Sequence, residues 1–115
     1  MFTHWEIKVY IGMSCANGAG FVNPFEIEQF ARNLSETRDG LSLAFQTGYW
    51  KGAQEGSAVL TLVIPMKANE PTAGEHEGRW IAEQAASRFG QECCLYTWAP
   101  INAALTTRQT QHIRL

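Results

Sequence analysis

The order of its apolar patterns constrains the fold of this 115-residue chain more than any single motif does. Near the N-terminus, Trp5, Ile7, Val9 and Ile11 alternate with more polar residues, and this period of two is that of a strand with one apolar face. The stretch SAVLTLVIP (57–65) is β-branched and mostly apolar, which is typical of a central strand. In all, the sequence predicts strands over residues 5–11, 41–45, 57–65 and 93–99.

A helical pattern follows the first predicted strand. Asn23 can cap this helix, Pro24 suits its first position, and Glu26 stands where a capping-box carboxylate reaches back. Apolar residues then recur at helical spacing. We expect the helix to end near residues 39–40, where Asp-Gly interrupts the pattern.

A second helical pattern lies between the third and fourth strands. Thr72 and Glu75 have the spacing of another capping box, Gly90 is a natural C-terminal stop, and residues 51–56 are turn-like. The resulting order is β-α-β-β-α-β. It predicts an α+β fold, a ferredoxin-like two-layer sandwich with a four-stranded antiparallel sheet and two helices on one face. We expect one domain over residues 1–99 and a C-terminal tail over 100–115.

The sequence contains four short pieces, YIGMS (10–14), GYWKG (48–52), SAVLTLVIP (57–65) and RFGQE (88–92). Together they resemble an uncharacterised bacterial family of small ferredoxin-like domains. That family's pattern has an aromatic-Gly-Leu-Ser after strand one, a Gly-Gln-Trp near the end of strand two, and an Arg-Phe-Gly-Gln-Glu after helix two. Met13 stands here in place of the leucine, and Tyr49 in place of the glutamine. The resemblance spans residues 7–98 and implies the fold but no activity.

Composition narrows the class of partner and the compartment. A net charge of −2 and a pI of about 5.9 argue against broad binding to nucleic acid. No apolar run is long enough to cross a bilayer, and the N-terminal stretch lacks the pattern of a signal peptide. The cysteines, Cys15, Cys93 and Cys94, are odd in number and two are adjacent, which is a poor disulfide framework. We therefore expect free thiols and a cytoplasmic location.

The glycine-rich loop after the first strand is the first candidate site. Its glycines at 12, 18 and 20 match neither dinucleotide-binding nor P-loop spacing, and it contains no lysine to meet a phosphate. Its polar groups are Ser14, Cys15 and Asn17. Cys15 would need a neighbouring base to act as a nucleophile, and none accompanies it. We interpret the loop as structural or partner-facing.

Catalytic, metal and cofactor signals are weak. His4, His76 and His112 are scattered along the sequence, whereas a metal site needs several ligands that converge. Cys93 and Cys94 are not a C-x-x-C motif, and we expect their thiols on opposite faces of the sheet. We therefore assign no catalytic residue, no metal site and no cofactor.

The sheet face away from the helices is the most informative predicted surface. If Trp5, Ile7, Val9 and Ile11 face the helices, then the residues between them face outward. A half-apolar surface of this kind marks an interface or a ligand site. An RNA-recognition domain uses the same face, but with stacking aromatics on strand three, where this chain has valine and threonine. The predicted binding residues are Glu6, Lys8, Tyr10, Trp50, Val59, Thr61 and Val63.

Two functional interpretations remain open on the sequence. The first is a protein-interaction or regulatory module, whose open sheet face pairs with a second copy or with another protein. The second is a small-molecule binder or enzyme of the dimeric α+β-barrel kind, for which Tyr10, Glu6 and Trp50 are the available candidates. We favour the first, without catalysis, because no acid–base pair stands out. The tail after Pro100 could instead fold back over the sheet within one chain.

Overall fold

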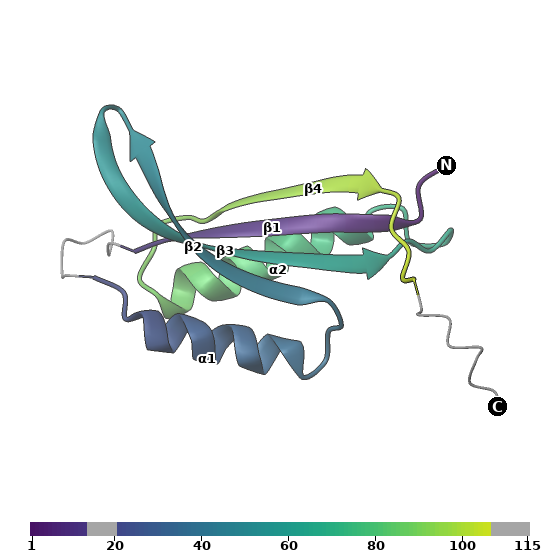
Figure 1. Ribbon diagram of the computed structural model, residues 1–115, viewed down its shortest axis with the longest axis horizontal. Coiled ribbons are helices and arrows are strands. Elements are labelled where there is room, and N and C mark those ends of the chain that lie inside the picture. The colour runs from purple at the N-terminus through teal and green to yellow at the C-terminus, as the bar shows by residue number, and fades with distance from the viewer. Residues whose placement is uncertain (14–20, 107–115) are drawn as a thin grey trace.

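The computed structural model describes residues 1–13 and 21–106, apart from the side chain of Trp50, and it shows the predicted order of elements (Figure 1). The strands pair antiparallel in the order β2-β3-β1-β4. Both helices pack against one face of this sheet, so the ferredoxin-like α+β sandwich is confirmed. The elements are β1 (His4–Gly12), α1 (Pro24–Ser35), β2 (Leu41–Trp50), β3 (Ala53–Pro65), α2 (Ala73–Arg88) and β4 (Leu95–Ile101).

The core lies between the sheet and the helices. Ile7, Val9 and Ile11 of β1 are fully buried, as their alternation predicts. Antiparallel pairing sets Ile7 beside Leu62 and Val9 beside Leu60, and both leucines are also fully buried. Ile27, Phe30 and Leu34 of α1, with Ile81 and Ala85 of α2, complete this layer.

Helix α1 begins as predicted and ends earlier than predicted. Oδ1 of Asn23 accepts a hydrogen bond of 2.9 Å from the backbone N–H of Phe25, which is an N-cap. The helix stops at Ser35, so the expected end near residues 39–40 was wrong. The chain leaves the helix and Arg38 reaches Glu77 of α2, 3.1 Å away, a tertiary contact that periodicity could not show.

Helix α2 lies unusually close to the sheet. A Cβ added to Gly74 would lie 2.6 Å from the Trp5 ring, and one added to Gly78 would lie 3.0 Å from the ring of Tyr96. Only glycine allows this approach. The second predicted capping box was wrong, because the side chain of Thr72 makes no cap hydrogen bond.

The hairpin between β2 and β3 turns at two residues. Lys51 and Gly52 have φ of +49° and +81°, and Trp50 pairs directly with Ala53, as in a tight two-residue hairpin loop. The predicted turn over residues 51–56 was therefore too long, because β3 already begins at Ala53. Figure 1 shows this hairpin reaching past the helices at the upper left.

Strand β4 is shifted relative to its prediction over residues 93–99. It runs from Leu95 to Ile101 and contains Pro100, which is tolerated because β4 pairs only with β1 at the sheet edge. Beyond it, the side-chain oxygen of Thr3 accepts a 3.0 Å hydrogen bond from the Ala103 N–H. The chain just after β4 is therefore held against the N-terminus.

Candidate functional site

The uncovered side of the sheet, called the open face below, is built from alternate residues of all four strands. Cross-strand neighbours in an antiparallel sheet point to the same side, so the strand register identifies its members. The phase predicted for β1 and β3 is confirmed. The open face comprises Glu6, Lys8, Tyr10, Gly12, Ser42, Ala44, Gln46, Gly48, Glu55, Ser57, Val59, Thr61, Val63, Leu95, Thr97 and Ala99.

Side chains of the open face fall into rows that run across the strands. One row is apolar: Leu95, Tyr10, Val59 and Ala44. Within it, Val59 is only 8% exposed while Leu95 at the edge is 63% exposed. The next row is polar: Thr97, Lys8, Thr61 and Ser42. A third row sets Glu6 between Ala99 and Val63.

The side chains of the remaining predicted site residues are not among the described parts of the structure. Trp50 pairs with Ala53 at the tip of the hairpin, and its side chain is not among the described parts. Ser14, Cys15 and Asn17, the polar groups of the glycine-rich loop, lie outside the described residues. Their predicted roles therefore stay predictions.

A hollow of about 470 Å³ lies where β1 ends and the β2–β3 hairpin curls away, and we call it the end hollow. Three segments far apart in sequence meet there: residues 10–12, residues 48–49 and Gln91. They belong to three of the four short pieces that carry the family resemblance. The lining residues are Tyr10, Gly12, Gly48, Tyr49, Glu55, Ser57, Gln91, Cys93 and Leu95.

Gly12 is the floor on which two polar side chains of the end hollow converge. A Cβ added to Gly12 would lie 2.8 Å from Oε1 of Glu55 and 3.1 Å from Oε1 of Gln91. Nε2 of Gln91 donates to the Phe89 carbonyl oxygen at 3.2 Å, which fixes the amide with its oxygen toward Gly12. Two acceptor oxygens thus meet above one glycine. Sequence reasoning missed Glu55 because it lay in the predicted turn.

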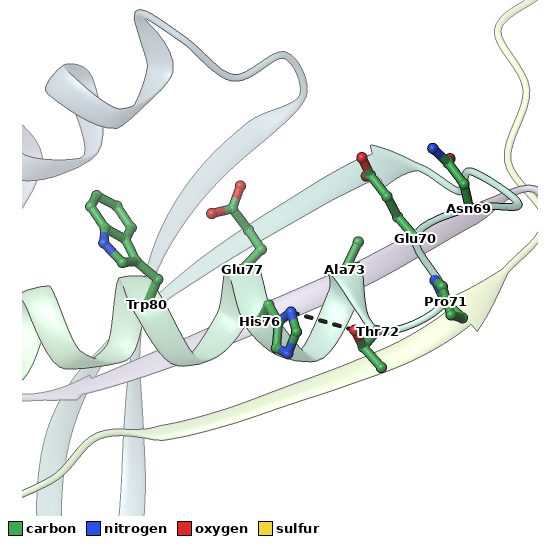
Figure 2. A pocket seen from close by; sticks show the side chains of 8 residues that line it. All are labelled: Asn69, Glu70, Pro71, Thr72, Ala73, His76, Glu77 and Trp80. Carbon is green, nitrogen blue, oxygen red and sulfur yellow. Dashed lines mark hydrogen bonds between the residues drawn. The ribbon is translucent and has the colours of Figure 1, made fainter.

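A second hollow, of about 570 Å³, surrounds the start of α2 (Figure 2). Three of its polar side chains, those of Thr72, His76 and Glu77, make local contacts. Nδ1 of His76 lies 3.4 Å from Oγ1 of Thr72, the dashed line in Figure 2. Glu77 pairs with Arg38, whose guanidinium lies 5.2 Å from the centre of the Trp80 ring. These contacts brace α2 against the segment after α1, and they do not form an acid–base arrangement.

The two described cysteines differ in environment, but both precede β4, so the prediction that they are strand residues on opposite faces of the sheet was wrong. Both are free and precede β4. Cys93 is exposed and lines the end hollow, whereas Cys94 packs against the core. Burial, with a smaller contribution from the neighbouring Cys93, raises the pKa of Cys94 to about 11.

Tyr96 is the other titratable group with a perturbed environment. Its hydroxyl donates a 2.7 Å hydrogen bond to Oε2 of Glu75 on α2. This hydrogen bond raises the pKa of Tyr96 above its ordinary value, because the carboxylate favours the protonated phenol. The contact ties β4 to α2 on the covered side of the sheet.

Within residues 1–13 and 21–106, no group of three or more His, Cys, Asp or Glu side chains is arranged to hold a metal ion. In the same part of the chain, no helix combines the length and apolar character needed to span a membrane.

Comparison with known proteins supports the fold. No protein-family model matches this sequence, and no curated protein matches it. A DUF3240 family protein from Shewanella baltica OS155 superposes with a TM-score of 0.59 at 14% identity, over 94% of this chain and 100% of that one. A phage SAM lyase in complex with S-methyl-5'-thioadenosine superposes with a TM-score of 0.59 at 11% sequence identity. The superposition covers 84% of this chain and 81% of the lyase chain. At such identities the likeness shows the α+β fold alone.

Proposed function

We propose that this protein is a small interaction module that pairs with a second copy of itself through the open face. The observation that carries the proposal is the contrast across one sheet: the helices cover one side, while the apolar row on the other side ends in a 63% exposed leucine. A two-fold dimer is the commonest way to cover such a surface. The strand edges of this face carry Ala44, Ser42, Thr97 and Ala99, small side chains that let two sheets approach closely.

Charge on the open face suits a second copy. Its charged members are Glu6 and Lys8, two positions apart on the central strand β1, and Glu55 of β3 at the end hollow. In a two-fold interface the same patch faces itself, so a dyad between Glu6 and Lys8 sets each Glu6 against the other copy's lysine. Burial of the apolar row at about 25 cal/mol per Å² supplies the driving force.

Sedimentation velocity over a range of concentrations tests the proposal. We expect wild type to dimerise and Ala44→Lys, which places a charge in the apolar row, to stay monomeric. Ser87→Lys is the matched control, because Ser87 is exposed on α2 in the helical layer. Circular dichroism checks that each variant is folded. A wild-type monomer at high concentration, or an Ala44→Lys dimer, overturns the proposal.

The tail provides a competing cover for the same face. Ala103, Ala104 and Leu105 line a hollow of about 490 Å³ together with Val63, at the opposite end of the open face from the end hollow. Cover by the tail would give a wild-type monomer that dimerises once residues 103–115 are removed. Self-association of the intact chain excludes this arrangement as the sole cover.

The small-molecule interpretation is the second candidate, and the end hollow is the observation that favours it. Catalysis by the residues predicted from sequence receives no such support. Glu6 and Tyr10 lie on one strand with Lys8 between them, about 13 Å apart at 3.3 Å per residue. No hydrogen bond joins these two described side chains, so we propose binding rather than catalysis for this candidate.

A further inference from the structure

We infer that the outer edge of β2 is a second surface of self-association, at which the hairpin end of the strand pairs antiparallel with the same strand of a second copy. The segment that carries the inference is residues 45–49, in the hairpin that Figure 1 shows reaching past the helices. Its contact is made along the edge of the sheet, whereas the proposed dimer covers the open face. The inference therefore goes beyond that dimer and does not depend on it.

The outer edge of β2 carries backbone groups without a strand to pair with. Among the described strands β2 pairs only with β3, and no other described backbone group donates to it or accepts from it. The pairing with β3 is continuous from Leu41 to Trp50 and contains no bulge. A regular edge of this kind presents a row of N–H and C=O groups that a further strand can use.

The two edges of the sheet differ in their protection against such pairing. Edge strands are commonly blunted by charged residues, by proline or by a bulge. Strand β4 is the shorter edge and contains Pro100, which has no N–H to donate. Strand β2 is longer, and its sequence LSLAFQTGYW contains neither a charged residue nor a proline. The edge that is open to a further strand is therefore that of β2.

The geometry of the hairpin identifies which residues of β2 point outward. In a two-residue hairpin, the residues that flank the loop exchange both backbone hydrogen bonds, and here these residues are Trp50 and Ala53. Hydrogen-bonded positions alternate along an antiparallel strand, so the even-numbered residues of β2 are those bonded to β3. The backbone N–H and C=O groups of Phe45, Thr47 and Tyr49 therefore point away from β3, toward the outer edge.

The spacing of two exposed aromatic residues favours a second copy as the occupant of this edge. Phe45 is 47% exposed and Tyr49 is 73% exposed, and each lies two positions from Thr47. A two-fold axis through Thr47 would set each Phe45 directly beside the second copy's Tyr49. Aromatic cross-strand pairs stabilise antiparallel strands, and an uncharged strand sets no like charges against itself. The edge is thus complementary to itself, as a two-fold contact requires.

Amide hydrogen exchange of the intact protein, measured by NMR at low and at high concentration, tests this contact. Because the paired segment is short, we expect the contact only at high protein concentration. The amides of Phe45, Thr47 and Tyr49 should then exchange at least about tenfold more slowly than in dilute protein. The amide of Gln46 should be protected at both concentrations, since it is bonded to β3. Unchanged exchange at Thr47 up to millimolar concentration overturns the inference.

A charge on the two-fold axis should remove this protection. Thr47→Lys sets two lysines directly opposite each other and should abolish the concentration effect at Phe45 and Tyr49. Ser87→Lys, the same change at an exposed position of α2, should keep the effect. Mixing the Thr47→Lys and Thr47→Glu proteins should restore it, because opposite charges then face each other. Persistent slowing in folded Thr47→Lys, or no recovery in the mixture, overturns the inference.

Variants of the open face separate the two contacts. Val63→Lys charges the open face on β3 and leaves β2 unchanged, so slow exchange of the Thr47 amide at high concentration should persist. Ala44→Lys charges both the open face and the edge strand, so it should abolish the effect. Loss of the effect in folded Val63→Lys overturns the edge contact and leaves the sedimentation test of the open face unaffected.

Discussion

The two faces of the sheet use the same strands and reach opposite outcomes. On the covered face, Ile7, Val9, Leu60 and Leu62 are fully buried, and α2 comes so close that only glycine fits at position 74. On the open face, the residues between them remain partly exposed, in alternating apolar and polar rows. One face is completed by the chain's own helices, whereas we propose that a second copy covers the other.

The largest expected effect is a core truncation compared with its neighbour across the sheet. Leu60→Ala should lower the free energy of unfolding by about 2–5 kcal/mol, because it removes buried methyl groups and leaves a cavity. Thr61→Ala, one residue along on the open face, should cost less than about 1 kcal/mol. Urea unfolding measures both. Similar losses for the two would contradict the distinction between the faces.

Close packing of α2 gives the next largest effect. Gly74→Ala should destabilise the protein by about 1–3 kcal/mol, because its methyl group would overlap the Trp5 ring, and this exceeds alanine's helix advantage of about 1 kcal/mol. Gly48→Ala in β2 is the control, because the nearest atom to a Cβ added there is 3.7 Å away. It should leave stability nearly unchanged. A stabilised Gly74→Ala protein would mean that α2 has room to shift.

Loss of a helix cap should have a smaller effect on stability, and the starts of α1 and α2 provide a matched pair of variants. Asn23→Ala should cost about 1 kcal/mol, because the Phe25 N–H loses its acceptor. Thr72→Ala should cost less than about 0.5 kcal/mol, since Thr72 makes no cap hydrogen bond. Thermal unfolding of both variants provides the comparison. Equal losses would show that Thr72 caps α2 in solution.

The reactivity of the thiols distinguishes an exposed cysteine from one packed against the core, and it can be measured without changing the stability of the protein. Because the pKa of Cys94 is raised to about 11, its thiolate is scarce at pH 8 and grows only as the pH approaches that value. Iodoacetamide should therefore label Cys93 well before Cys94 in the folded protein, as mapped by peptide mass spectrometry. In denaturant, all three cysteines should react. Recovery of a missing pair only after reduction would disprove the free thiols.

Local patterns were sufficient to predict the fold because each depends on neighbours in sequence. The alternation of β1 gave its buried face, and Asn23 gave the start of α1. Periodicity placed the end of α1 too late: the helix stops at Ser35, and Arg38 beyond it pairs with the distant Glu77. Thr72 matches a capping box, yet its hydroxyl lies nearest His76. Sequence patterns carry no information about such competing partners.

The open face was predictable, whereas the end hollow was not. Strand phase alone assigns Lys8, Thr61 and Val63 to the open side, because side chains alternate along a strand. To predict the end hollow, one would have to know how β1 pairs with β3 and where Gln91 lies after α2. Its one sequence signal was the set of short pieces shared with the resembling family, which gained a common location only in three dimensions.

Concentration-dependent methyl NMR tests the central claim, that the open face is the surface of self-association, most directly. Val59, Thr61 and Val63 alternate along β3 with Leu60 and Leu62, so one strand carries reporters for both faces. On raising the protein concentration, we predict that the valine and threonine methyl signals shift and broaden while the two leucines stay nearly constant. No change in any of them, or changes confined to residues of the helical layer, would contradict the account.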